Sequence, residues 1–127
     1  MNKAKALNMF WSQFGLDAFE ENSLPTEASK RPSFPYITYF VATDSFGNEI
    51  SLSGSLWYRE RSWLNCEEKT QEIANKIGRG GLFISLGNNE KLWIKKGTPF
   101  AQSMGDDSDE LIKRKLINIT AEFFTAD

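Results

Sequence analysis

The amino-acid sequence predicts a single α+β domain, with two helices packed on one side of a mainly antiparallel or mixed β-sheet. Three observations lead to this fold class. The length of 127 residues suits one compact domain with a core of its own. Two pairs of segments rich in strand-forming residues flank a helical segment. A long segment in which polar and apolar residues alternate follows them. The expected order is α-β-β-α-β-β-β, and no linker or repeat divides it, so residues 1–127 are expected to form one domain.

The first expected element is a helix at residues 4–14, which ends at Gly15. Its apolar residues recur with the period of a helix and form one stripe, which consists of Ala6, Leu7, Phe10, Trp11 and Phe14. Residues 17–34 contain two prolines and many polar side chains, so we expect an irregular connection there. One short extended piece is expected near residues 16–19.

A β-hairpin is expected next. Residues 36–43 are rich in β-branched and aromatic side chains, and residues 44–48 supply the turn. Residues 49–58 alternate between two faces: Ser51, Ser53 and Ser55 lie on one, and Ile50, Leu52, Leu56 and Tyr58 on the other. This alternation predicts a strand with one buried and one polar face.

The second helix is expected between Ser62, as its N-cap, and Gly78, as its C-terminal stop. Its apolar stripe consists of Trp63, Cys66, Thr70, Ile73, Ala74 and Ile77. A second hairpin is expected from residues 82–86 and 91–96, followed by a polar loop at residues 100–110. In residues 111–125 polar or charged positions again alternate with apolar ones, which predicts a long final strand.

Composition excludes several classes of chemistry. The sequence contains 0 His and 1 Cys, which removes His-dependent nucleophilic catalysis, imidazole metal sites and an intrachain disulfide. The net charge of −2 gives no general attraction to nucleic acid or anionic membranes. No segment resembles a signal peptide or a membrane span. We therefore expect a soluble, cytoplasmic domain without catalytic residues, cofactor or metal.

Three features that suggest chemistry have simpler interpretations. The glycines at residues 78–81 close a helix instead of opening one, so they predict a helix cap and not a phosphate-binding loop. The acidic residues between 106 and 110 lack the ligand spacing of a calcium loop and predict a solvated loop. Cys66 lies on the apolar stripe of its helix, which predicts a buried, unreactive thiol.

The aromatic content has two interpretations that remain open at this point. The chain holds 10 Phe, 4 Trp and 3 Tyr, which either fill an unusually aromatic core or form contacts with other subunits. Basic residues interleave with Trp57, Tyr58, Trp63 and Trp93. Such surfaces also bind single-stranded nucleic acid, which is the minority interpretation because the net charge is negative.

Six segments together point to a known family. They are PYITY (35–39), ATDSFGN (42–48), SLWYR (55–59), RGG (79–81), WIKKGTPFAQ (93–102) and AEFFTAD (121–127). As a set they resemble the tail terminator, or tail-completion, proteins of long-tailed bacteriophages and of prophages of Gram-positive bacteria. The resemblance covers nearly the whole chain, and its segments are structural instead of catalytic.

The resemblance implies a non-enzymatic virion protein that forms a hexameric ring on the phage tail tube, stops tube growth and offers a surface for head joining. Its partners would be copies of itself, the tail tube protein and a head-completion or connector protein, with no membrane and no specific nucleic acid. It would be assembled in the host cytoplasm and reside in the neck of the virion tail. The alternatives are a head-completion or minor capsid protein of the neck and, less favoured, a nucleic-acid-binding module.

Two candidate sites follow from these residues. We expect contacts between subunits at the hairpin turn around Phe46 and at the strand end formed by Trp57, Tyr58 and Arg59. The acidic residues are expected to line the ring's central channel, where like charge would keep DNA from adhering: Asp106, Asp107, Asp109 and Glu110. The alternative for these acidic residues is a loop on the outside of the ring.

Overall fold

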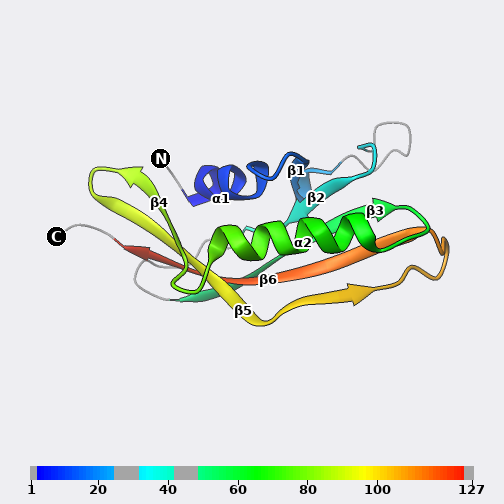
Figure 1. Ribbon diagram of the computed structural model, residues 1–127. Coiled ribbons are helices and arrows are strands. Elements are labelled where there is room, and N and C mark those ends of the chain that lie inside the picture. Colours follow the sequence, from blue (N-terminus) through cyan, green and yellow to red (C-terminus); the bar gives the residue numbers. More distant parts are fainter. Residues whose placement is uncertain (1–2, 25–31, 42–48, 125–127) are drawn as a thin grey trace.

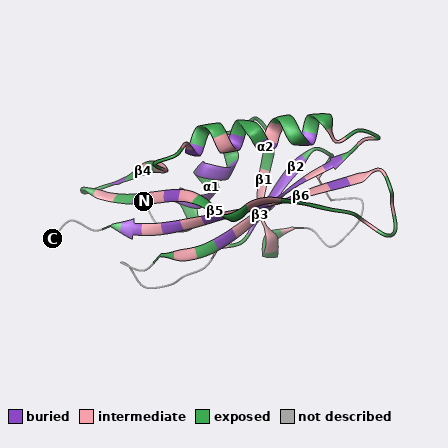
Figure 2. Ribbon diagram, turned by 60° about the horizontal axis from the view of Figure 1, so that its bottom comes forward, coloured by how far each residue is buried: buried purple, intermediate pink, exposed green. Residues whose placement is uncertain are grey.

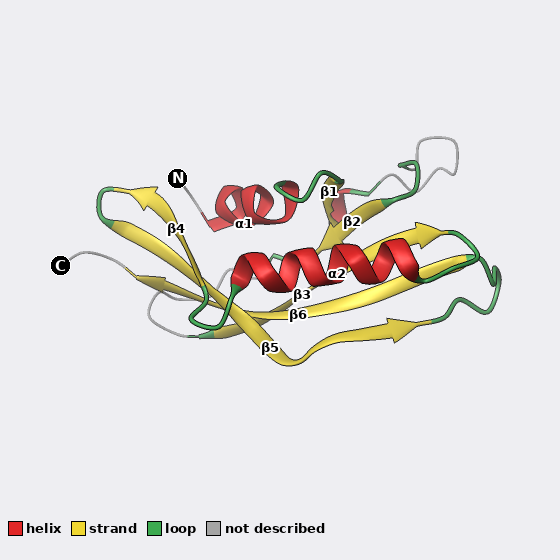
Figure 3. Cartoon of the chain, in the orientation of Figure 1, coloured by secondary structure: helices red, strands yellow, loops and turns green. Residues whose placement is uncertain are grey.

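A computed structural model describes residues 3–24, 32–41 and 49–124 of the chain (Figure 1). It contains two α-helices, a short 3-10 helix and six strands. In chain order these are α1 (Lys3–Ser12), β1 (Asp17–Glu20), η1 (Glu21–Ser23), β2 (Tyr36–Tyr39), β3 (Ile50–Arg59), α2 (Leu64–Ile77), β4 (Leu82–Gly87), β5 (Glu90–Met104) and β6 (Ile112–Phe124). Figure 3 shows both helices against a twisted sheet.

The strands form one mixed sheet in the order β1-β2-β3-β6-β5-β4. β1 pairs with β2 in parallel, and every other neighbouring pair is antiparallel. The expected single α+β domain is thus confirmed in its class. The expected order of elements was wrong, because the extended piece near residues 16–19 is a true strand, β1, at one edge of the sheet.

Both helices cover the same face of the sheet. On that face Trp11 of α1 lies over Gly54 of β3, where an added Cβ would come within 2.7 Å of the indole ring. Gly54 pairs with Ile117 on β6. Lys115, two residues before Ile117 and therefore on the same face of β6, contacts Glu67 of α2. Figure 2 shows the helices on one side of the sheet and the buried residues concentrated between the layers.

Most residues of the two expected apolar stripes are buried, but Trp63 and Ala74 are only partly buried, and α1 ends at Ser12, so that Phe14 is buried beyond its end. α1 buries Ala6, Leu7, Phe10 and Trp11, and α2 buries Cys66, Thr70, Ile73 and Ile77. α2 begins one residue later than expected: Trp63 occupies the N-cap position, while the Ser62 hydroxyl accepts a hydrogen bond from the Leu64 N–H at 3.0 Å. Gly78 ends the helix at φ 70° and donates its N–H to the Ala74 carbonyl, which confirms the expected stop.

Alternation along β3 and β6 separates the two faces of the sheet. Leu52, Leu56 and Tyr58 face the helices, whereas Ser51, Ser53 and Ser55 lie on the other face, as expected. In β6 the odd-numbered residues from Lys113 to Phe123 are buried beneath the helices. The even-numbered residues belong to the face that the helices leave uncovered.

β5 is longer than the sequence indicated. The chain was expected to leave the sheet at residues 97–99, but β5 continues to Met104, so the loop expected at residues 100–110 starts later. A register shift between Lys96 and Ala101 accommodates the interruption, and Ala101 then pairs with Ile117 of β6. The long β6 therefore holds β5 in the sheet on both sides of the irregular segment.

The first hairpin is confirmed through the antiparallel pairing of β2 with β3, and its turn at residues 44–48 lies outside the described residues. Within the described ranges, no helix is both long and apolar enough to cross a membrane.

Candidate functional site

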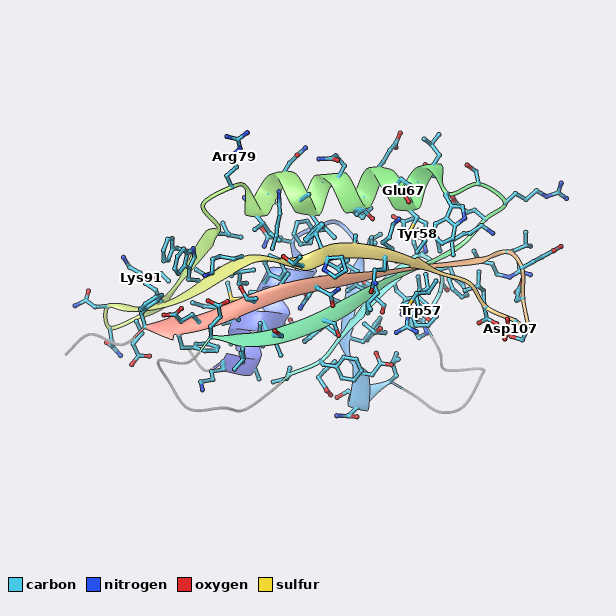
Figure 4. All side chains as sticks on the ribbon, turned by 90° about the horizontal axis from the view of Figure 1, so that it is seen from below. Trp57, Tyr58, Glu67, Arg79, Lys91 and Asp107 are labelled. Carbon is cyan, nitrogen blue, oxygen red and sulfur yellow. The ribbon has the colours of Figure 1, made fainter. Side chains whose placement is uncertain are left out.

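The strand end at residues 57–59 divides its side chains between the two faces of the sheet. Figure 4 shows Trp57 on the side away from α2 and Tyr58 on the side of α2. Arg59 is exposed at the end of β3. Phe46, the fourth expected contact residue, lies outside the described residues.

Tyr58 is part of the core, with only 5% of its surface exposed. Burial raises the pKa of its phenol to about 12, and the nearby Cys66, Glu60 and Glu72 add to the rise. The phenol is therefore protonated at neutral pH. Because Tyr58 is already covered within the subunit, Trp57 and Arg59 are the residues of the strand end 57–59 that a neighbouring molecule can reach.

Trp57 is held rigidly on the uncovered face. Its indole N–H donates to the Thr38 hydroxyl at 2.8 Å, and its ring stacks on Tyr36 with 6.1 Å between the ring centroids. The guanidinium of Arg114 lies 4.8 Å from the Trp57 ring centroid and donates to the Ser55 hydroxyl at 3.0 Å. These contacts fix both large side chains before any partner binds, which lowers the entropy cost of binding.

The stacked pair is part of a larger group that spans β1, β2, β3 and β6. Tyr36 also contacts Phe34 at 5.3 Å and Phe19 at 6.4 Å between ring centroids. We call this group the Trp57 cluster; it consists of Phe19, Phe34, Tyr36, Trp57 and Arg114. Tyr36 is buried, with 9% of its surface exposed, whereas the other four residues are partly or fully exposed. Aromatic residues and arginine are the residue types that concentrate binding energy in protein interfaces.

The acidic loop is tied to this strand end, which the sequence did not reveal. Arg59 donates through Nε to Asp109 Oδ2 at 2.8 Å. The Glu60 N–H donates to the Leu111 carbonyl at 2.9 Å, and the Leu111 N–H donates to Asp109 Oδ1 at 2.9 Å. Arg59 and Asp109 were assigned to separate sites, yet they form one ion pair at one end of the sheet.

Hydrogen bonds within the loop restrain half of its carboxylates. Asp106 Oδ1 accepts from the N–H and the hydroxyl of Ser108 at 2.8 and 2.6 Å. These bonds lower the pKa of Asp106, and the Arg59 and Leu111 donors lower that of Asp109. The side chains of Asp107 and Glu110 are exposed, and Figure 4 places Asp107 at the tip of the loop. The loop is thus a structured, negatively charged end of the molecule.

A second group lies on the uncovered face; the sequence placed Trp93 among basic residues, but its contacts with Phe83 and Phe124 were not expected. Phe83 of β4 stacks on Trp93 of β5 at 5.3 Å, and Trp93 contacts Phe124 of β6 at 6.1 Å between centroids. Lys95 lies 4.3 Å from the Trp93 ring centroid, and Lys91 lies 5.9 Å from that of Phe83. We call these five residues the Trp93 row. The alternation of the second hairpin, which sets Phe83 opposite Trp93, was the signal that could have revealed it.

Cys66 is buried as predicted. None of its surface is exposed, and burial raises the pKa of its thiol to about 11; Lys115 lowers it, but Glu67 and Glu60 raise it again. The thiol is therefore protonated and unreactive at neutral pH. In the parts of the chain that are described, no three acidic or cysteine side chains gather as metal ligands would.

Comparison with known proteins adds no family assignment. No family model matches the chain, and no curated protein matches its sequence. The described residues present two aromatic groups on one uncovered sheet face and an acidic loop at one end of the molecule.

Proposed function

We propose that this chain is a non-enzymatic structural subunit of a phage tail terminator. In this proposal copies of the chain form a ring, expected to be a hexamer, that caps the tail tube, ends its growth and presents the surface to which the head-completion or connector protein binds. The protein is assembled in the host cytoplasm and stays in the neck of the virion. The Trp57 cluster, a rigid aromatic surface on the uncovered face, is the observation that supports it most.

The Trp57 cluster suits contact between proteins better than it suits catalysis. The Trp57 N–H donates to the Thr38 hydroxyl, so a partner can cover the indole ring without leaving this donor unpaired. Arg114 donates through Nε to the Ser55 hydroxyl, and a partner that covers it has to supply acceptors for the other guanidinium N–H groups. A head-completion or minor capsid protein of the neck would need a similar surface and remains the nearest alternative within phage assembly.

The Trp93 row favours a second candidate, a nucleic-acid-binding module. Stacked rings flanked by lysines on an uncovered sheet face are a known arrangement for binding single strands. Lys95 is, however, paired with Glu49 at 2.9 Å, and Glu122 lies beside Trp93 in the register of the sheet. These carboxylates weaken the attraction for phosphate. Salt-sensitive binding of an oligonucleotide that is lost in Lys91→Ala would favour this candidate.

Mass measurement in solution, combined with negative-stain imaging, tests the terminator proposal. The protein is studied alone and with tail tubes from the phage or prophage that encodes it. We expect rings, either free or on tube ends, and tubes of fixed length when the protein is present during polymerisation. Monomers that ignore tube ends at all concentrations, with tubes of unchanged length, would overturn the proposal.

Trp57→Ala isolates the role of the Trp57 cluster. We expect weaker ring assembly by on the order of tenfold or more, because truncating an aromatic hot spot of an interface costs about 2 kcal/mol or more. Leu64→Ala is the matched control, since Leu64 is an exposed apolar residue at the start of α2. Equal assembly by the folded Trp57→Ala protein and the control would remove the cluster from the interface.

A further inference from the structure

The two edges of the sheet differ in chemistry. β1 and β4 are the outer strands of the described sheet, and each pairs with a neighbour on one side only. An edge strand can pair with another strand on its open side, so proteins commonly protect it with charged side chains. β1, with the sequence DAFE, carries two carboxylates in four residues. β4, with the sequence LFISLG, carries no charge at all.

β4 therefore has the character of a docking edge. Phe83 exposes 54% of its surface, and Met9 of α1, beside it, exposes 45%. Together with Leu82, Ile84 and Lys76 they line a groove of about 290 Å³ next to the strand. An uncharged, apolar edge strand of this kind is an aggregation hazard unless a defined partner covers it.

The charges around the two edge strands indicate which strand of a second copy can pair with β4. The surroundings of β4 are mainly basic: Lys76 lines the groove, Arg79 precedes the strand and Lys91 lies opposite Ser85, while the acidic Glu90 lies opposite Gly87 at the end of the strand. Figure 4 shows Arg79 and Lys91 at the end of the molecule opposite the acidic loop. The β1 edge is acidic, with Asp17 and Glu20 in the strand and Glu21 directly after it. Contact between two β4 edges or two β1 edges would bring like charges together, whereas β4 against β1 pairs opposite charges.

The aromatic groups of the uncovered face point to the same pairing. The Trp93 row begins at the β4 edge with Phe83, and the Trp57 cluster begins at the β1 edge with Phe19. The sheet register places both on the uncovered face. A neighbour's β4 beside β1 would join the two groups into one continuous aromatic surface across the contact.

We propose that the β4 edge of one copy of this chain docks against the β1 edge of a second copy, so that the sheet continues from subunit to subunit. The contact is head-to-tail, because two different surfaces meet. Repetition of such a contact produces a ring when the rotation closes. This inference rests on the proposed ring function and names the surfaces that build the ring.

Cysteine cross-linking tests the pairing directly. Ser85→Cys places a thiol on β4 and Asp17→Cys one on β1, both at exposed positions on the uncovered face. Each variant is treated with a short bismaleimide, alone and mixed with the other, in the presence and absence of tail tubes. The wild type is the control, because Cys66 is buried and unreactive. We expect cross-linked dimers in the mixture only, and a ladder of larger products from the double variant.

Each other outcome has a distinct meaning. A dimer from Ser85→Cys alone would show that β4 pairs with itself and would overturn the head-to-tail contact. Rings in the electron microscope without any cross-link would overturn this inference and leave the ring function intact. Absence of both rings and cross-links would count against the proposed function as well.

Charge reversal supplies a second measurement that does not depend on the register. Asp17→Lys with Glu21→Lys should weaken self-association by on the order of tenfold or more, because attraction becomes repulsion. Lys76→Glu with Arg79→Glu in the same chain should restore it. Glu68→Lys, an exposed reversal on α2, is the control. Loss of association without rescue would contradict complementary pairing of these two edges.

Discussion

Gly54→Ala tests how α1 is seated on the sheet. Gly54 lies in the middle of β3, where a Cβ would come within 2.7, 2.9 and 3.0 Å of three atoms in the six-membered ring of Trp11. Trp11 has none of its surface exposed, contacts Phe10 at 4.9 Å and stacks on Tyr39 at 6.2 Å between centroids. The indole therefore has no free space to move into, and the substitution overpacks the core.

The magnitude follows from two opposing terms. Overpacking of this kind costs about 1–3 kcal/mol. Replacing glycine stiffens the unfolded chain and returns about 0.4–1 kcal/mol. We expect a net loss of about 1–2 kcal/mol in the free energy of unfolding. With a urea m-value of about 2 kcal/mol per molar, in the middle of the usual range, the midpoint should fall by about 0.5–1 M.

Urea unfolding followed by circular dichroism measures this loss. Gly105→Ala is the matched control, because a Cβ there meets nothing within 4 Å, and it should leave the midpoint unchanged or raise it. Trp11→Phe removes the six-membered ring of the indole that the new methyl group would strike. In that background Gly54→Ala should cost at least about 1 kcal/mol less, which a double-mutant cycle resolves. Equal costs in both backgrounds would refute the contact with Trp11 as the cause.

Two further predictions concern titrating groups. With its pKa raised to about 11, the Cys66 thiol should react with a disulfide reagent at pH 8 at least about 100-fold more slowly in the folded than in the unfolded protein, and comparable rates would contradict its burial. Asp109 has a lowered pKa, so the stability it contributes is complete above its unfolded value of about 3.8 and is lost as pH falls through the folded value. Arg59→Ala should move the Asp109 pKa measured by NMR back towards 3.8, whereas an unchanged value would show that the ion pair does not cause the shift.

Local sequence patterns were sufficient to predict the elements in which apolar residues recur with a regular period over a long stretch. The helical stripe that contains Cys66 and the alternation of residues 49–58 and 111–125 each identified an element and its buried face. Periodicity works there because one face of each element packs against the core and the other does not. The position of Trp57 on the face opposite Tyr58 follows from the same alternation.

Short or interrupted segments could not be assigned in this way. β1 has four residues, too few to show a period, and it is a strand because β2 pairs with it. β5 continues past Gly97 because β6 provides hydrogen-bonding partners on both sides of the register shift. In both cases the backbone conformation depends on pairing with another strand, which the local residue pattern does not reveal.

The sequence by itself determined that this is one α+β chain of aromatic, histidine-free composition, and which faces of its main elements are apolar. Only the tertiary structure decided that Arg59 meets Asp109, and that an uncharged β4 and an acidic β1 form the two edges of the sheet. The physical reason is that burial follows local periodicity, whereas strand neighbours, sheet edges and ion pairs across 50 residues depend on how distant segments come together.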